Sequence, residues 1–301
     1  MKRGFKLLAS LIIVALCAGG ADKAAAATPH VLSVEGGTGS GTHATKEKVT
    51  VTADAPAAGK FFDRWTGSKG LKLRKEDLSS FVLEMPDSDA TLVAHYGDIA
   101  SSKLIRVACV GDSITEIVGY PKELGELLPK DQYEVRNFGV SSATALFNSQ
   151  KPYYKEPAFR AAKDYKPNIV VVLLGTNDTR KAQPNTYQNI ADFVPNYRQI
   201  VTELAGVETA PKVYLALPTP IYGEGNWGLN EENLQAGVLP RIKQVADELK
   251  LPVIDAHAAL SDHPEYFKDR VHPNGDGPKL LAATVYKAIT GKDAPATTAK
   301  K

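Results

Sequence analysis

The chain has 301 residues, with 36 Lys and Arg against 34 Asp and Glu, and a formal net charge of +2. A chain of this length can form one large or two smaller domains, and its apolar and charged fractions are those of an ordinary globular protein. The near-neutral balance gives no electrostatic basis for binding nucleic acid or an anionic membrane surface.

Residues 1–27 have the pattern of a bacterial signal peptide. Three basic residues precede an apolar run over 7–18, and a run of alanines follows that ends at Ala27. We expect cleavage near Ala27 and a secreted or periplasmic protein, because the run is too short to remain as a membrane span. Cleavage would remove a net charge of +3, so the mature chain would have a formal net charge of −1. It would also leave Cys109 as the single thiol, so no internal disulfide could form.

Residues 28–98 are expected to form a small all-β module. Short β-branched and aromatic runs alternate there with turn residues, and they predict strands at 31–34, 49–53, 61–65, 81–85 and 91–96. Phe61, Phe62 and Trp65 could form a sugar-stacking surface, but at strand spacing they favour a domain core.

The order of features in this module resembles the internalin-B-type repeat modules of bacterial surface and secreted proteins. A glycine-rich turn is followed by Val-Thr-Val-Thr (49–52), Phe-x-x-Trp-Thr-Gly (62–67), Met-Pro-Asp (85–87) and a final Tyr96. Such a module could bind a glycan, tether the protein to a surface or brace the following domain. The sequence does not choose among these roles.

Residues 99–291 alternate strand and helix, and the tail 292–301 is expected to be disordered. Short apolar runs predict strands at 104–110, 133–138, 168–174, 212–217 and 252–255. Helical patterns fall at about 120–129, 156–164, 186–206, 229–250 and 278–290, and Pro195 is expected to kink or split the third. This alternation predicts right-handed crossovers and one five-stranded parallel sheet with helices on both faces.

Reactive residue types follow three of these strands. The first strand ends at Gly-Asp-Ser-Ile-Thr (111–115), the second leads into 137–144, and the third ends at Gly-Thr-Asn-Asp (175–178). An Asp-x-x-His pair lies in 269–274, before the last helix. Because ligands bind at the carboxyl edge of parallel sheets, we expect a nucleophile, hydrogen-bond donors and a base to meet there, as acyl transfer requires.

The four segments, in this order, resemble the four sequence blocks of the SGNH (GDSL-type) hydrolases over residues 104 to about 290. The resemblance implies a flavodoxin-like three-layer α/β/α sandwich and no cofactor. The α/β-hydrolase alternative lacks its own motif, because no Gly-x-Ser-x-Gly elbow is present.

The resemblance also implies roles for five residues. Ser113 would attack the ester carbonyl, His272 would act as the base, and Asp269 would fix the tautomer of His272. The oxyanion would be met by the N–H groups of Ser113 and Gly139 and by the side-chain amide of Asn177. Activity would then rise through one ionisation near neutral pH as His272 becomes a free base.

Other residues in these segments have competing interpretations. Asp112 favours a brace for the serine turn, and Asp178 favours a cap for the following segment. The rival nucleophiles are Ser141 and Ser142, and the rival bases are His257 and His263. Candidates for substrate contact are Asp112, Ser141, Tyr222 and Trp227.

The leading hypothesis is an exported serine esterase that removes acetyl groups from a polysaccharide. The loop 218–228 should overhang the pocket, and its aromatic and glycine residues suit a sugar ring or an acyl chain. A lysophospholipase or thioesterase of the same fold is the first alternative, although the chain lacks a long apolar lid segment. An inactive glycan-binding or adhesion protein is the second alternative, against which the four intact segments argue.

Overall fold

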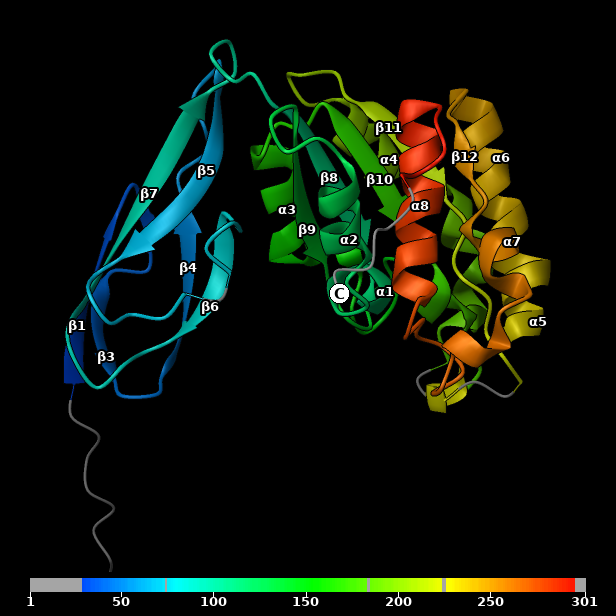
Figure 1. The fold of residues 1–301 in the computed structure, drawn as a ribbon. Coiled ribbons are helices and arrows are strands. Elements are labelled where there is room, and N and C mark those ends of the chain that lie inside the picture. The colour runs from blue at the N-terminus through cyan, green and yellow to red at the C-terminus, as the bar shows by residue number, and fades with distance from the viewer. Residues whose placement is uncertain (1–28, 74, 183–184, 224–225, 296–301) are drawn as a thin grey trace, which may run out of the picture.

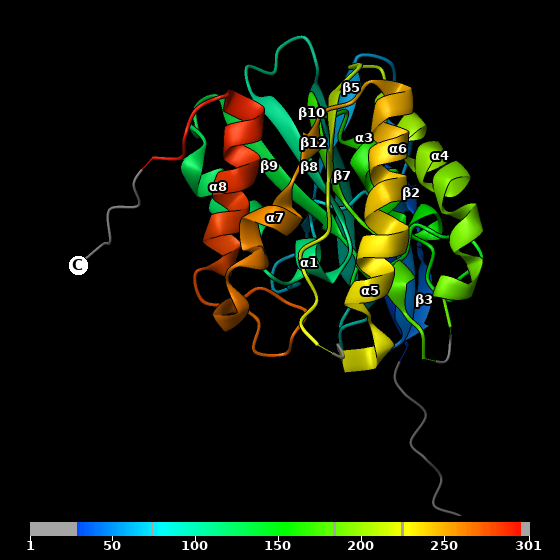
Figure 2. The same ribbon diagram turned by 90° about the vertical axis from the view of Figure 1, so that its right-hand side faces the viewer.

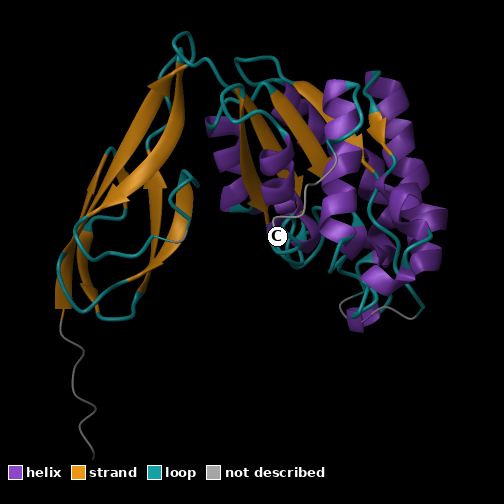
Figure 3. Ribbon diagram, in the orientation of Figure 1, coloured by secondary structure: helices purple, strands orange, loops and turns teal. Residues whose placement is uncertain are grey.

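The computed structural model describes residues 29–73, 75–182, 185–223 and 226–295. An all-β region and an α/β region lie side by side (Figure 1; Figure 3). The predicted signal peptide and the last six residues of the predicted tail lie outside the described residues.

The α/β region is built on a five-stranded parallel sheet with the strand order β12-β11-β10-β8-β9. The strands are β8 (Ile105–Gly111), β9 (Tyr133–Gly139), β10 (Ile169–Leu173), β11 (Lys212–Ala216) and β12 (Val253–Ile254). The order reverses between β8 and β10, the strands that precede Ser113 and Asn177, and ligands of open α/β sheets bind at such a switch point. The predicted flavodoxin-like sheet is confirmed.

Helices cover both faces of the sheet (Figure 1; Figure 2). One face packs on α3 (Pro157–Asp164), α4 (Phe193–Ala205) and α6 (Leu239–Leu249). The other packs on α2 (Tyr120–Leu127), α7 (Ala256–Ser261) and α8 (Gly277–Thr290). Alternate residues of each strand enter the two cores, which is why the strands are apolar on both faces. In the part of the chain that the structure describes, no helix is long and apolar enough to cross a membrane.

Two of the predicted helices are interrupted. The segment 186–206 contains a 3-10 helix, Tyr187–Asp192, and then α4, with the break at Asn189 (φ −98°, ψ 15°). The prediction that Pro195 kinks or splits this helix is wrong. Pro195 lies in the first turn of α4, where a backbone N–H is not needed for a helical hydrogen bond. The segment 229–250 contains α5 (Glu231–Asn233), a π-helical turn (Leu234–Val238) and α6.

The all-β region consists of two small sheets, β3-β1-β7-β5 and β2-β4-β6. Their strands are β1 (Pro29–Glu35), β2 (Gly37–Thr38), β3 (Gly41–Ala44), β4 (Lys48–Ala53), β5 (Lys60–Gly67), β6 (Ser80–Glu84) and β7 (Ala90–Asp98). Phe62 and Trp65 are each 1 % exposed in the core of this region, so they cannot present a sugar-stacking surface.

Phe61 joins the all-β region to the α/β region. Neighbouring residues of a strand point to opposite faces, so Phe61 points away from the core that contains Phe62. Its ring packs edge-on against Tyr165 at 6.3 Å, and the Arg106 guanidinium lies 4.4 Å from its centroid. Phe61 is therefore part of the hydrophobic core of the α/β region.

Polar contacts reinforce this junction. The buried Arg136 guanidinium, stacked 4.3 Å over the Tyr165 ring, donates to Asp63 and to Glu134. The Ser79 hydroxyl donates to Asp164 at 2.8 Å, among other contacts across the junction. The two regions thus share a packed and hydrogen-bonded interface.

Candidate active site

Ser113 is the first residue of the short helix α1 (Ser113–Glu116), directly beyond the carboxyl end of β8. Gly111 allows this turn, because a Cβ at that position would overlap the backbone oxygen of Leu173 on β10. Asp112 caps α1 by accepting the Ile114 N–H at 3.0 Å. Asp112 is fully buried, which raises its pKa to about 6. The prediction that Asp112 contacts the substrate is wrong, because an enclosed side chain cannot reach a ligand. Asp112 instead braces the turn.

Ser113, His272 and Asp269 lie in one hydrogen-bonded line. The Ser113 Oγ is 2.8 Å from His272 Nε2, and His272 Nδ1 is 2.6 Å from Asp269 Oδ2. The other carboxylate oxygen of Asp269 accepts the backbone N–H groups of Val271 and His272. Burial acts to raise the pKa of Asp269, but the hydrogen bonds from His272 and Val271 outweigh it and hold that pKa below its usual range. Asp269 is therefore ionised at neutral pH and orients the imidazole.

The two rival bases have other partners. His257 Nδ1 lies 3.1 Å from the Pro218 carbonyl oxygen, and its Nε2 lies 3.3 Å from Glu231. His263 Nδ1 lies 3.0 Å from Glu265. Neither histidine contacts Ser113, so the geometry favours His272 as the base.

The backbone N–H of Gly139 is not free to bind an oxyanion, contrary to the prediction. Its N–H donates to the side-chain oxygen of Asn137 at 2.9 Å, and a Cβ at Gly139 would overlap the backbone of Glu116. Gly139 is a glycine because β9 passes close under α1 at this point. The prediction that Gly139 completes the oxyanion hole is therefore corrected.

Ser142, three residues further along, has the backbone geometry that the site needs. Its φ is +65°, in the left-handed region that favours glycine. Among the described residues, the N–H groups of Ser142 and Ser113 have no hydrogen-bond acceptor. Asn177 lines the same pocket as Ser142, and its amide donates to the Ala143 carbonyl oxygen at 3.0 Å, leaving its second N–H available. The residue type does not indicate this geometry, because position 142 is a serine, whereas a glycine there would have suggested a positive φ.

Asp178 holds the loop that carries Ser142. Its two carboxylate oxygens accept the N–H groups of Ala145 and Leu146 at 3.0 and 2.8 Å. The expectation that Asp178 caps the segment following it is wrong, because it binds a loop more than thirty positions earlier. Burial raises the pKa of Asp178 to about 7, although the two backbone hydrogen bonds oppose the shift. From the other side, Glu116 accepts the Ser141 N–H at 2.7 Å.

The raised pKa of Asp178 predicts a pH-dependent contribution to stability. The folded protein binds this proton more tightly than the unfolded chain does, so the stabilisation is complete below about pH 3.8 and is lost as pH rises through about 7. Relative to Asp178→Asn, the wild-type free energy of unfolding should fall by up to about 4 kcal/mol over that range. Urea titrations across pH measure this difference. Asp87→Asn, on an exposed turn, is the control, and a pH-independent difference for Asp178→Asn would contradict the prediction.

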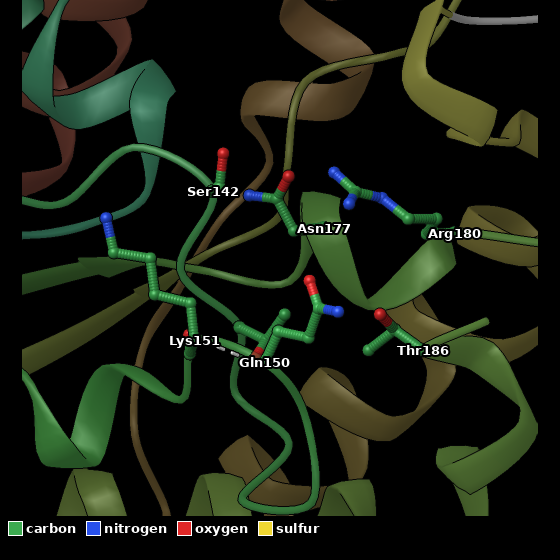
Figure 4. A pocket seen from close by; sticks show the side chains of 7 residues that line it. Ser142, Gln150, Lys151, Asn177, Arg180 and Thr186 are labelled. Atoms are coloured by element: carbon green, nitrogen blue, oxygen red, sulfur yellow. Dashed lines mark hydrogen bonds between the residues drawn. The ribbon is translucent and has the colours of Figure 1, made fainter. Parts of the chain in front are cut away.

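A polar pocket opens beside Asn177 (Figure 4). It has a volume of about 490 Å³ and is lined by Ser142, Thr144, Gln150, Lys151, Asn177, Arg180 and Thr186. A second hollow of about 320 Å³ shares Gln150 and Thr186 with it. The other side chains of that hollow are amides and a hydroxyl, from Asn148, Ser149, Asn185, Gln188 and Asn189. Together they form a hydrophilic groove that leads away from Asn177.

The remaining candidates for substrate contact differ in placement. The Tyr222 hydroxyl donates to the carbonyl oxygens of Leu260 and Ser261, and its ring packs on Phe267 at 4.9 Å. The prediction that Tyr222 contacts the substrate is therefore wrong, because its hydroxyl is hydrogen-bonded within the protein and its ring packs on Phe267. Trp227 is 57 % exposed with its ring 5.7 Å from the His272 ring, so it stands at the edge of the site. The Ser141 carbonyl oxygen accepts from Lys151 at 3.0 Å.

A serine at the carboxyl edge of a flavodoxin-like sheet, hydrogen-bonded to a His–Asp pair, has the arrangement of a serine hydrolase. The chain belongs to the GDSL-like lipase/acylhydrolase family, whose pattern matches residues 109–280. Residues 30–100 match the divergent InlB B-repeat domain. Both family resemblances seen in the sequence are confirmed.

Individual relatives agree with this assignment. An acetylxylan esterase from Xylanibacter ruminicola is 33% identical over 211 residues, which cover 62% of this chain and 43% of that protein. The chain thus matches less than half the length of this relative. An acetyl xylan esterase of known structure is 25% identical with a TM-score of 0.50, over 62% of this chain and 100% of the other. A carbohydrate acetylesterase from Sinorhizobium meliloti (20% identity, TM-score 0.50, 62% and 98% coverage) supports the fold alone.

Proposed function

We propose that this protein is an exported serine esterase that removes acetyl groups from a polysaccharide. The observation that carries the proposal is the continuous hydrogen-bonded line from Ser113 through His272 to Asp269. The signal-like pattern of residues 1–27 supports export.

The proposed reaction uses these three side chains in two steps. His272 Nε2 takes the proton of the Ser113 hydroxyl while the Ser113 Oγ attacks the acetyl carbonyl carbon, and Asp269 stabilises the imidazolium that forms. The proton then passes to the leaving sugar oxygen, and the acetyl group remains on Ser113. Water attacks this ester with His272 again as the base, which releases acetate and restores the serine.

The oxyanion of each tetrahedral intermediate requires donors that are free and fixed in place. We assign this role to the N–H groups of Ser113 and Ser142 and to the side-chain amide of Asn177. Supporting this assignment are the lack of an acceptor for both backbone groups among the described residues and the anchoring of Asn177 on the Ala143 carbonyl oxygen. Donors held in advance stabilise the transition state without reorganisation at the moment of reaction.

Asn177→Ala is expected to lower kcat by about 10²- to 10³-fold, because it removes one oxyanion donor. The KM should change little, since the interaction strengthens only as the oxyanion forms. Steady-state kinetics on p-nitrophenyl acetate measure both constants. A variant that raised KM at constant kcat would instead assign Asn177 to ground-state binding.

The walls of the groove favour a carbohydrate over a long acyl chain. Amide and hydroxyl side chains line both hollows, and these groups pair with sugar hydroxyls, whereas an alkyl chain would leave them unsatisfied. The relatives described as acetylxylan esterases support the same substrate class.

Acetate release from a panel of acetylated glycans, including acetylated xylan, tests the proposed function directly. Along a series of p-nitrophenyl esters, kcat/KM should be highest for acetate and fall towards octanoate. A profile that rises towards octanoate would favour the lysophospholipase or thioesterase alternative. No turnover of any ester by folded protein would favour the adhesion alternative.

The value of kcat/KM is expected to rise with increasing pH between about pH 5 and about pH 8. His272 must be unprotonated to accept the serine proton. Asp269 does not add a second step there, because its pKa is lowered and it is already ionised. Initial rates on p-nitrophenyl acetate between about pH 5 and about pH 8 measure the profile. A flat profile would contradict His272 as the base.

A further inference from the structure

We infer that the pocket beside Asn177 binds a carboxylate-bearing sugar, such as a uronic acid, attached to the acetylated sugar unit. This inference rests on the proposed acetylesterase function and names a more specific class of substrate for it. The inference depends on the charged side chains that line the pocket and on their unused hydrogen-bond donors.

The pocket is charged with one sign only. Lys151 and Arg180 are its two charged residues, and no Asp or Glu lines it. In Figure 4 the two side chains lie on opposite sides of Ser142 and Asn177. Of the nearby carboxylates, Asp178 is used by Ala145 and Leu146, and Glu116 is used by Ser141 and Lys75. Among the residues that the structure describes, neither Lys151 nor Arg180 therefore has an ion-pair partner.

Arg180 in particular has a side chain without partners among the described residues. Its Nε is buried without a hydrogen-bond partner, and its guanidinium forms no ion pair with any residue that the structure describes. A buried guanidinium donor without an acceptor is costly, so proteins normally satisfy it. Arg136, for example, has such partners in Asp63 and Glu134. An acceptor supplied by the ligand would remove this cost.

The geometry of the donors selects the kind of anion. A guanidinium presents parallel N–H groups that match the two oxygens of a carboxylate, and such pairs are strong and directional. Lys151 uses one donor on the Ser141 carbonyl oxygen and has two others to offer. Gln150 and Thr186 add neutral polar groups for hydroxyls, and about 490 Å³ is within the range of small-ligand sites.

The pocket is also in the right place for a neighbouring sugar. Asn177 lines the pocket and is the proposed oxyanion donor, so a group bound there lies next to the acetyl group under attack. A carboxylate held by Arg180 would position the glycan relative to Ser113. The pocket would thereby select acetylated glycans that carry acidic sugars.

The test uses one acetylated xylo-oligosaccharide with a uronosyl branch, in two forms. One form has the free carboxylate, and in the other the carboxyl is reduced to a neutral alcohol. At low ionic strength, wild-type kcat/KM should favour the carboxylate form by about tenfold, and added salt should reduce that preference. Arg180→Gln should remove most of the preference, and Lys151→Met should weaken it.

Two lysines provide matched controls. Lys181→Gln removes a charge adjacent to Arg180 that is exposed and paired with Glu232, and Lys155→Met removes an exposed charge near Lys151. Both should keep the wild-type preference. If any loss of positive charge reduced the preference for the carboxylate form, both control variants would also lose that preference. This result would contradict the carboxylate site in the pocket.

The outcomes separate this inference from the proposed function. Equal turnover of both forms by the wild type would overturn the carboxylate pocket and leave the acetylesterase function in place. No acetate release from either form, or from any acetylated glycan, would overturn both. A preference that survives in Arg180→Gln, or an equal loss of activity on both forms in that variant, would overturn the role given to Arg180.

Discussion

Ser113→Ala is expected to lower kcat/KM on p-nitrophenyl acetate by at least about 10³-fold, one of the largest effects of any single substitution in this chain. The Ser113 hydroxyl oxygen is the proposed acceptor of the acetyl group, and it lies 2.8 Å from His272 Nε2, with which it can share a proton. Loss of a triad nucleophile leaves only the smaller catalysis given by the oxyanion donors.

The fold should survive this substitution, because a methyl group fits where the hydroxymethyl group stood. Thermal unfolding should therefore match that of the wild type. Ser261→Ala, a serine on α7 whose hydroxyl donates to the His257 carbonyl oxygen, is the matched control and should retain activity. Turnover by Ser113→Ala close to that of the wild type would transfer the role of nucleophile to another residue, with Ser141 tested next.

Arg136→Met is expected to destabilise the whole protein by about 2–3 kcal/mol. The substitution keeps much of the apolar stem but removes the cation paired with Glu134 and one of the two cations paired with Asp63. These two side chains are partly exposed, which reduces the cost below that of a fully buried pair. The free energy of unfolding in urea measures the effect.

Arg64→Met is a matched control, because Arg64 also pairs with Asp63 but is 58% exposed. Its effect should stay below about 1 kcal/mol, as for most surface ion pairs. Equal effects of the two substitutions would show that the buried Arg136 guanidinium adds no more to stability than an exposed ion pair does. We expect instead that Arg136 links the unfolding of the all-β region to that of the α/β region, so that both unfold in one transition.

The same contacts bear on the role of the all-β region. Phe61 lies in the core of the α/β region, while Phe62 and Trp65 are enclosed in the core of their own region. None of the three aromatic residues that could have stacked on a glycan is available to one. The contacts favour a brace over a tether, and we expect the catalytic domain without residues 29–98 to have a lower unfolding temperature.

The sequence by itself located the strands of the sheet and the three residues of the proposed triad. Buried parallel strands are continuous apolar runs, so β8, β9 and β10 could be located within about two residues, and with them the turns that hold Ser113 and Asn177. Asp269 and His272 are three residues apart, which is close enough for the pairing to be proposed without a structure. The order β12-β11-β10-β8-β9 was implied by the resemblance to the SGNH hydrolases, whose fold is flavodoxin-like.

Only the tertiary structure decided which backbone and side-chain atoms are free to face the proposed site. The choice of Ser142 over Gly139 depends on one backbone dihedral and on the hydrogen bond from Gly139 to Asn137, which residue types do not reveal. Tyr222 and Asp178 were assigned wrongly because their partners, Leu260 and Ala145, are far away in the sequence. Lys151 and Arg180 meet in one pocket for the same reason: strand order, and not chain order, sets which loops become neighbours.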